Sequence, residues 1–296
     1  EIYQCDWSSD VCSSDLEFMD MIPHKSIEGQ NLEVAPEDFV VIPELFGFVM
    51  SQLTKLPCGK IVLCQAYDHI LETLQPGISW QQLGFLKCIT TSNSLKEYIE
   101  SVMRGVSFDI LKPFISTDFK QSGLPSKPII AIHSREQRDS INVIKTFYLK
   151  FPQYRWVTFR DMRGLSQKEF SSGIKDSCLS VWIDETSSYG TFPLESMKCG
   201  VPVLGLVPNM VPEWMSENNG LWINNKVQIP DFIANYLQNW LEDNLNESLL
   251  DEMKKTSESQ LSESDFEKQS VELFQHYIET RLNSFEEQLN KLQPVE

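Results

Sequence analysis

A glycine turn, a short helix and a buried strand follow one another between residues 187 and 205, and this order limits the folds that the chain can adopt. The stretch reads Ser-Ser-Tyr-Gly-Thr-Phe-Pro-Leu-Glu-Ser-Met-Lys-Cys-Gly and then Val-Pro-Val-Leu-Gly. We expect a turn at Gly190, where glycine permits a positive φ, and a helix that ends at Gly200, with Glu195 in its first turn. A helix N-terminus attracts phosphate, and a nearby carboxylate accepts hydrogen bonds from ribose hydroxyls. The segment therefore predicts a site for a nucleotide diphosphate that carries a sugar.

Residues 189–203 resemble the donor-site signature of GT-B glycosyltransferases, close to family 4, whose pattern runs roughly E-G-F-G-L-x-x-L-E-A-M-A-C-G-x-P-V. Glu195 falls on the second glutamate of that pattern, which in the family binds the nucleotide ribose. The first glutamate falls on Ser187, and Glu185 replaces it if the loop is longer here. The resemblance implies that Glu185 and Ser187 meet the transferred sugar. It also implies donor contacts at Tyr189, Gly190, Thr191, Phe192, Leu194 and Glu195.

Two arginines follow the strand expected at residues 129–133. In the family an arginine and a lysine at this place hold the donor diphosphate. Arg135 matches the arginine, whereas the lysine falls on Ser140, so that Arg138 or Lys145 would supply the second charge. Arginine suits the task because its planar fork makes paired, charge-assisted bonds to phosphate oxygens. We expect Arg135 and Arg138 in the donor site; the alternative is a pair of surface arginines bound to neighbouring acids.

Polar residues also end other expected strands. The stretch 65–69, Gln-Ala-Tyr-Asp-His, ends a first-domain strand, and family members often place a histidine near here that faces the sugar. His69 matches with a shift, and a half-buried structural histidine is the alternative. One of Asp184, Glu185 and Ser187 contacts the sugar, or the three cap the following turn. Arg160, Asp161 and Arg163 either contact the nucleotide base or form a solvated loop.

From residue 38 onward, short apolar runs alternate with helical patterns. Such alternation implies parallel β-α units. The expected strands cover residues 39–42, 60–64, 85–90, 129–133, 155–159, 178–183 and 201–206. Residues 91–94 are expected to cap the helix that follows them, and Ser166 is expected to cap another helix. The stretch 121–128, which contains glycine and proline, is the best candidate for a linker.

We therefore expect an α/β protein of the GT-B class, with two doubly wound Rossmann-like domains, of which the first is incomplete, and a C-terminal helical segment. The first, acceptor-side domain would cover residues 19–122 and the nucleotide-sugar domain residues 123–255. A helix and an acidic tail would cover 256–296. In GT-B enzymes the last helix crosses back onto the first domain; the alternative here is a helix that covers the edge of the second domain.

The start of the chain has a different character. Residues 6–16, Asp-Trp-Ser-Ser-Asp-Val-Cys-Ser-Ser-Asp-Leu, are what translation of a common sequencing-adapter end gives. We interpret residues 1–18 as an artefact joined to an N-terminally truncated gene; the alternative is an ordinary polar extension. The absence of the family's opening glycine-rich loop and of further β-α units before residue 39 agrees with truncation.

Composition excludes several classes of protein. The net charge is −17, and residues 241–296 hold 14 acidic and 5 basic residues, which argues against nucleic-acid binding. The sequence contains no run of about 18 apolar residues, so no transmembrane helix is expected. A peripheral contact with a membrane stays open. The five cysteines after residue 16 form no C-x-x-C pair, which favours a reducing, cytoplasmic compartment. No D-x-D or H-E-x-x-H motif occurs, so neither a metal site nor a cofactor is expected.

The resemblance implies a glycosyltransferase that moves a sugar from a nucleotide-diphosphate sugar to an acceptor hydroxyl, with retention of configuration and without a metal. The acceptor stays open between a saccharide, a lipid and a protein, as do the sugar, the base and the oligomeric state. One alternative is a GT-B-fold sugar-nucleotide epimerase. Another is a non-catalytic binding or partner protein, which Ser187, Ser140 and the incomplete first domain favour. A NAD-dependent dehydrogenase is disfavoured because no G-x-G-x-x-G follows an expected strand.

Overall fold

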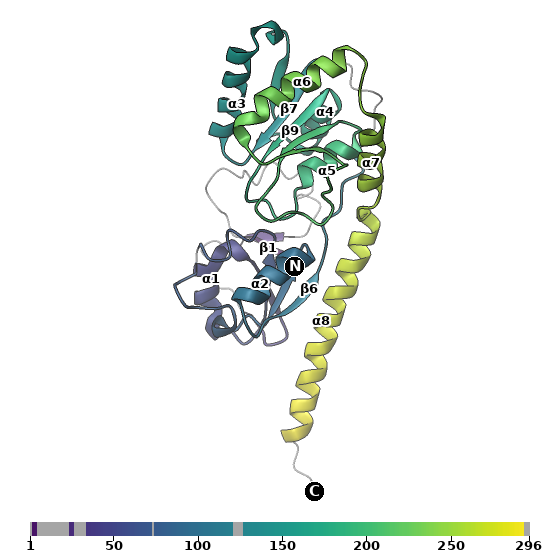
Figure 1. The fold of residues 1–296 in the computed structure, drawn as a ribbon. Coiled ribbons are helices and arrows are strands. Elements are labelled where there is room, and N and C mark those ends of the chain that lie inside the picture. The colour runs from purple at the N-terminus through teal and green to yellow at the C-terminus, as the bar shows by residue number, and fades with distance from the viewer. Residues whose placement is uncertain (1, 5–23, 27–33, 73, 121–126, 293–296) are drawn as a thin grey trace.

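The computed structural model describes residues 2–4, 24–26, 34–72, 74–120 and 127–292. It contains two larger parallel sheets and one two-stranded sheet, in which β1 (Ile2–Gln4) pairs in parallel with β2 (His24–Ser26). The lower body in Figure 1 is built on β3 to β6, and the upper body on β7 to β11. We call these the first and second domains. Apart from Ile2–Gln4, the segment interpreted as an artefact lies outside the described residues, as do residues 121–126 of the expected linker.

The second domain is built on a five-stranded sheet in the order β11-β10-β9-β7-β8, with every neighbouring pair parallel. Counted from β7 as the first strand, this is the doubly wound order 2-1-3-4-5, which reverses direction between β7 and β9. The strands are β7 (Ile129–Ser134), β8 (Thr158–Asp161), β9 (Leu179–Ile183), β10 (Val203–Leu206) and β11 (Leu221–Ile223).

Helices cover both faces of this sheet, as a doubly wound domain requires. On one face Val181 and Ile183 of β9 pack against α3 and α6. On the other, Trp182 packs in a cluster with residues of α4, α5 and α7. Because alternate residues of β9 face the two layers of helices, all five of its residues are buried. The helices are α3 (Gln137–Lys150), α4 (Gln167–Lys175), α5 (Thr191–Lys198), α6 (Ile229–Leu241) and α7 (Glu247–Glu258).

Local signals predicted most of these boundaries. Ser166 caps α4 through a capping box with Glu169, as expected from its sequence. The start of the strand expected at 155–159 is wrong. A 3₁₀ helix at Pro152–Tyr154 is followed by a turn, in which the N–H of Val157 donates to Tyr154 O at 3.0 Å. The strand β8 begins only at Thr158, where pairing with β7 starts.

The first domain has a four-stranded parallel sheet in sequential order, β3-β4-β5-β6. Right-handed crossovers between sequential strands place their connecting segments on one face. There, Val62 and Cys88 pack with Leu95 and Ile99 of α2. The elements are β3 (Phe39–Pro43), α1 (Gly47–Gln52), β4 (Gly59–Cys64), β5 (Lys87–Thr90), α2 (Asn93–Val102) and β6 (Ser107–Ile110), with short 3₁₀ helices at Glu44–Phe46, Leu53–Lys55 and Gln81–Leu83.

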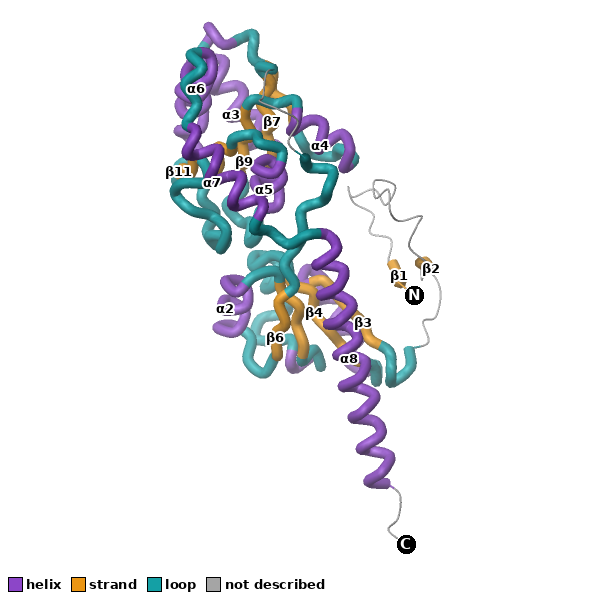
Figure 2. The backbone as a smooth tube through the Cα atoms, turned by 90° about the vertical axis from the view of Figure 1, so that its right-hand side faces the viewer, coloured by secondary structure: helices purple, strands orange, loops and turns teal. Residues whose placement is uncertain are grey.

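The other face of the first sheet is covered by α8 (Glu263–Leu292), which crosses back from the second domain (Figure 2). Tyr277 packs with Ile61 and Ile89 of the sheet, and its hydroxyl donates to Asp109 Oδ2 at 2.5 Å. Arg281 Nε donates to the carbonyl oxygen of residue 36 at 2.6 Å. The last helix therefore crosses back onto the first domain, as the GT-B resemblance implies.

Three further observations concern the described residues alone. None of their helices combines the length and apolar character needed to cross a membrane. Within them, no group of three or more His, Cys, Asp or Glu side chains is arranged to hold a metal ion. The described cysteines, Cys58, Cys64, Cys88, Cys178 and Cys199, are buried and free of disulfides.

We predict that Tyr277→Ala lowers the free energy of unfolding by about 3 kcal/mol, because it removes a fully buried ring from between α8 and the sheet. Leu282→Ala on the same helix is the control. Its side chain is 48% exposed, and we expect it to cost less than about 1 kcal/mol. Urea unfolding of both variants measures the difference. Equal losses of stability would show that α8 does not hold the first domain.

Candidate functional site

The carboxyl ends of β7 and β9 meet at the point where the strand order of the second domain reverses. In open α/β sheets ligands bind in the crevice at this switch point. Arg135 follows β7 directly, and its backbone N–H donates to Ile183 O, the last residue of β9, at 3.4 Å. The polar residues 184–187 follow β9. The structure thus brings the predicted arginine and the predicted sugar-contacting segment to one place.

The Arg135 side chain reaches across to the first domain. Its Nη1 lies 2.8 Å from Asp68 Oδ2 and also donates to Thr186 Oγ1. Its Nη2 donates to His69 Nε2, and Nδ1 of the same ring lies 2.8 Å from Glu72 Oε2. Because arginine only donates and a carboxylate accepts, this arrangement keeps the proton of His69 on Nδ1. The predicted residues His69 and Arg135 are therefore in direct contact.

Two partners of Arg135, Asp68 and Thr186, were not among the expected site residues. Asp68 precedes His69 in the stretch after β4, and one of its oxygens, Oδ1, is buried without a hydrogen-bond partner among the described residues. Thr186 lies in the polar segment after β9. The signal for both was their position at the carboxyl end of a parallel strand, where side chains from several strands converge.

The loop that carries Asp68 and His69 is held by Glu44. One oxygen of this buried carboxylate accepts from the backbone N–H of Gln65 at 3.1 Å and of Ala66 at 2.8 Å. Burial raises the pKa of Glu44, and these backbone hydrogen bonds oppose the shift. Glu44 thus fixes the first-domain loop that faces Arg135.

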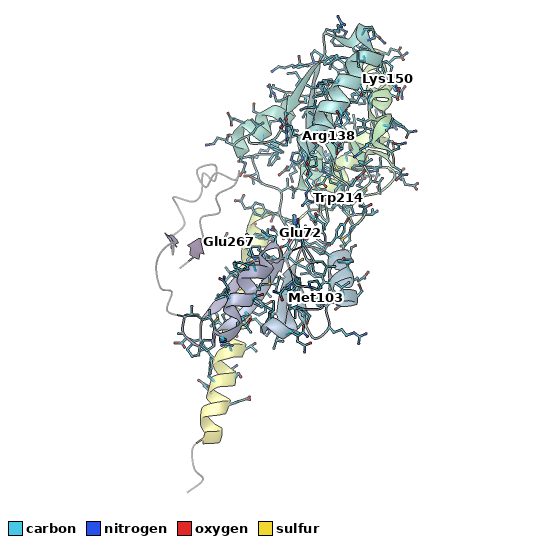
Figure 3. The ribbon with its side chains drawn as sticks, turned by 90° about the vertical axis from the view of Figure 1, so that its left-hand side faces the viewer. Glu72, Met103, Arg138, Lys150, Trp214 and Glu267 are labelled. Atoms are coloured by element: carbon cyan, nitrogen blue, oxygen red, sulfur yellow. The ribbon has the colours of Figure 1, made fainter. Side chains whose placement is uncertain are left out.

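Other polar contacts join the two domains beside this cluster. The N–H of Tyr67 donates to Ser188 Oγ at 3.0 Å. Glu213 Oε1 accepts from the first backbone N–H groups of α2, at Asn93 (2.5 Å) and Ser94 (3.2 Å). In Figure 3 Glu72 and Trp214 lie near the level at which the two domains meet. The carboxyl edges of both sheets therefore face each other.

The position of the family's diphosphate-binding lysine is occupied by a buried serine. Ser140 Oγ lies 2.5 Å from Ser134 Oγ, which in turn donates to the carbonyl oxygen of residue 136. This bond joins α3 to the end of β7. Arg138 is exposed on the first turn of α3 and, within the described residues, forms no hydrogen bond or ion pair. Lys145 lies eight residues after the start of that helix, or about 12 Å along its axis. Arg138 is therefore the basic residue nearer to the carboxyl end of β7, where a second positive charge is expected.

Gly190 has the positive φ expected of the turn before α5. Its φ is +73°, and a Cβ placed on it would lie 2.9 Å from the Trp182 ring and 3.3 Å from the Trp214 ring. A side chain is therefore excluded by conformation and by space. No side chain caps the N-terminus of α5, so its first N–H groups remain available to an anion. Thr191, the first residue of the helix, is exposed.

Three side chains of the motif are buried in the protein. The Phe192 ring is buried and stacks on His133, with ring centres 5.2 Å apart. Leu194 is fully buried in the core. Tyr189 is buried too, and its hydroxyl donates to Gln260 Oε1 at 3.0 Å, at the junction of α7 and α8. Donor contacts predicted at these positions would have to come from the backbone.

Glu195 is the fifth residue of α5, so its expected place in the first turn is wrong. Four helical residues, 191–194, separate it from the Gly190 turn, so it lies just beyond the first turn of the helix. The Glu195 carboxyl is half-buried, and burial raises its pKa to about 7. Among the described residues no side chain or backbone group forms a hydrogen bond or ion pair with it. Hydroxyl donors of a ligand would offset the lost hydration.

The segment after β9 combines a cap with free side chains. Asp184 Oδ1 accepts from the N–H of Thr186 at 2.9 Å and of Ser187 at 3.1 Å, which is the capping role considered for this cluster. Glu185 is exposed and Ser187 is half-buried. Their side chains are not used by this cap, so they remain free to meet a ligand in the crevice.

No protein-family model and no curated protein matches the sequence. Several solved structures do match. Pneumococcal GtfA, an O-GlcNAc transferase solved with UDP and GlcNAc, is 13% identical, with a TM-score of 0.56 over 84% of this chain and 58% of GtfA. Sucrose-phosphate synthase from Thermosynechococcus elongatus is 11% identical, with a TM-score of 0.58 over 82% of this chain and 74% of the synthase.

HepE from Anabaena, solved with UDP-glucose, is 10% identical, with a TM-score of 0.57 over 80% of this chain and 78% of HepE. The chain thus spans less than two thirds of GtfA and about three quarters of the other two proteins. Identities this low establish the fold and no more. Together with the two facing parallel-sheet domains and the returning α8, they show that this chain has the GT-B fold.

Proposed function

We propose that the chain acts in sugar transfer from a nucleotide-diphosphate sugar to an acceptor hydroxyl. The proposal is supported by three features that follow the adjacent strands β7 and β9 at the switch point of the sheet: Arg135, the uncapped N-terminus of α5, and the Glu195 carboxyl, which has no partner among the described residues. These groups suit a diphosphate next to a ribose. Since the structures of GtfA and HepE hold UDP or UDP-glucose, uridine is the first base to test.

In this proposal the crevice stabilises the leaving group. Negative charge grows on the diphosphate as the bond to the sugar breaks, and Arg135 and the N–H groups of Thr191 and Phe192 face that charge. Preorganised donors of this kind are often the largest catalytic contribution. His69, Glu185 and Ser187 would face the transferred sugar. The motif resemblance further supports retention of configuration and a reaction that needs no metal.

Donor binding would also change the contact between the domains. Arg135 is bound to Asp68 and His69 in the structure. A diphosphate carries more negative charge than Asp68, so it would take over the guanidinium and release the two first-domain side chains toward the sugar. The ion pair thus holds Arg135 in place before the donor arrives. Asp68 then competes with the donor diphosphate for the guanidinium.

A non-catalytic nucleotide-binding protein is the second candidate function. The buried Ser140–Ser134 pair favours it, because the family's lysine is replaced by a residue that takes part in the core. The presence of Ser187 where the family has its first glutamate also favours a non-catalytic protein. Such a protein would bind the nucleotide at the same crevice and would not turn over the sugar.

We predict that Glu195→Gln weakens UDP binding about tenfold, since a lost hydrogen bond to a charged group costs about 1.5 kcal/mol. In the unmodified protein UDP affinity should rise between pH 6 and 8, because the carboxyl becomes the better acceptor above its pKa of about 7. Calorimetric titration across this range measures both effects.

Glu217→Gln, an exposed glutamate in a loop of the same domain, is the matched control and should leave affinity unchanged. Any rise in affinity due to the phosphates themselves persists in Glu195→Gln, so only the difference between the two proteins counts. An identical affinity and pH profile for Glu195→Gln and the unmodified protein would contradict a ribose contact.

A second prediction concerns the competition for Arg135. Asp68→Asn should tighten UDP binding by up to about fivefold, because a partly exposed ion pair is worth at most about 1 kcal/mol. Arg135→Ala should weaken it. The control is Asp231→Asn, which removes an aspartate paired with Lys150 outside the Arg135 cluster. Weaker binding by Asp68→Asn would contradict the competition.

A further inference from the structure

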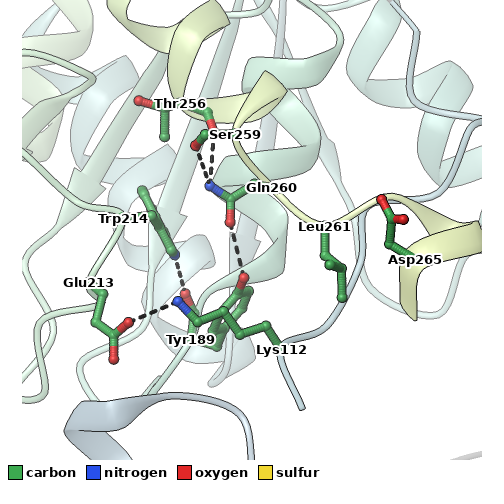
Figure 4. Close-up of a pocket in the computed structure, with 9 residues that line it drawn as sticks. All are labelled: Lys112, Tyr189, Glu213, Trp214, Thr256, Ser259, Gln260, Leu261 and Asp265. Atoms are coloured by element: carbon green, nitrogen blue, oxygen red, sulfur yellow. Dashed lines mark hydrogen bonds and ion pairs between the residues drawn. The ribbon is translucent and has the colours of Figure 1, made fainter. Parts of the chain in front are cut away.

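A cavity of about 580 Å³ lies apart from the Arg135 cluster, where segments of both domains meet (Figure 4). Its walls come from the segment after β6, the turn before α5, the loop after β10 and the junction of α7 with α8. Its volume falls in the range of small-molecule sites. None of its lining residues belongs to the Arg135 cluster. The residues that decide its chemistry are Lys112, Tyr189, Glu213, Trp214, Gln260 and Asp265.

The charges of this cavity disfavour a phosphate or a nucleotide. Its lysine, Lys112, is already paired with Glu213, with Nζ and Oε2 3.1 Å apart. Glu213 in addition accepts two backbone N–H groups of α2. Asp265 adds a further negative charge, and one of its oxygens accepts from Ser262. An anionic ligand would therefore meet net repulsion, and a neutral ligand would not.

The remaining groups suit a ligand rich in hydroxyls. The half-buried Trp214 ring offers an apolar surface of the kind on which the C–H face of a sugar packs. Around it lie acceptors and donors of hydrogen bonds, on Lys112, Glu213, Asp265 and the hydroxyls of Thr256 and Ser259. The two hydroxyls each donate to a backbone carbonyl oxygen of α7, and a hydroxyl that donates can still accept a hydrogen bond from a ligand.

The walls are fixed before any ligand arrives. Trp214 Nε1 donates to Tyr189 O at 2.6 Å. Gln260 Oε1 accepts from the Tyr189 hydroxyl, and its Nε2 donates to Thr256 O at 2.8 Å. Each of these side chains is held by another segment of the wall. A preformed site loses less conformational entropy on binding than a flexible one.

We propose that this cavity, which we call the hinge pocket, binds a neutral saccharide at a site separate from the nucleotide crevice. A ligand there contacts the segments that connect the two domains and also Tyr189, which precedes the Gly190 turn. The inference rests on the lining of the pocket and not on sugar transfer, so it stands or falls independently of the proposed function.

Saturation-transfer NMR with N-acetylglucosamine, maltose and lactose tests the proposal, with inorganic phosphate as the anionic probe. At least one saccharide should show transfer at millimolar concentration, and Gln260→Ala and Asp265→Ala should each weaken its affinity by about tenfold. Lys268→Ala, an exposed residue of α8 outside the pocket, is the control. UDP affinity of Asp265→Ala should equal that of the unmodified protein.

Two results would overturn the proposal. The first is that no saccharide receives saturation from the folded protein, or that inorganic phosphate binds and both pocket variants abolish its binding. The second is saccharide affinity that stays unchanged in Asp265→Ala and Gln260→Ala while Glu195→Gln removes it, because the sugar would then occupy the nucleotide crevice. The melting temperature of each variant tests whether it is folded. Because Asp265 is exposed, Asp265→Ala is the variant least prone to unfold.

Discussion

The ion pair of Arg135 with Asp68 is the contact on which the arrangement of the crevice depends. It joins the end of β7 in one domain to the loop after β4 in the other, with His69 and Thr186 as further partners of the guanidinium. The Arg135 side chain is partly exposed, so its ion pair with Asp68 is worth at most about 1 kcal/mol. An anionic ligand can therefore displace Asp68 from the guanidinium, and this exchange links ligand binding to the contact between the domains.

The helix α8 makes that contact durable. Sequential strand order leaves one face of the first sheet without connecting helices, and α8 supplies the missing cover through Tyr277 and its neighbours. The two domains are thus joined both by the chain before β7 and by this returning helix. The hinge pocket lies between these two connections, so the same architecture that closes the first core also creates this cavity.

The sequence patterns predicted the helices and strands better than they predicted the contacts between side chains. Apolar runs located six strands closely, and the Gly190 turn has the positive φ that its motif implied. The start of β8 was missed because Arg155 and Trp156 have strand-like composition but belong to a turn. Glu195 was expected in the first turn of α5, but four helical residues follow the Gly190 turn before it, so it lies just beyond that turn. Asp68 was missed although it lies in the stretch after β4, because its partner Arg135 lies in the other domain and the pairing itself leaves no pattern in one sequence.

The most direct test is a crystal structure of the chain with UDP. Our account predicts the diphosphate within hydrogen-bonding distance of Arg135 and of the first N–H groups of α5, with the ribose on Glu195 and with Asp68 no longer bound to the guanidinium. UDP seated elsewhere, or an Arg135–Asp68 pair that persists with the nucleotide bound, would contradict the account.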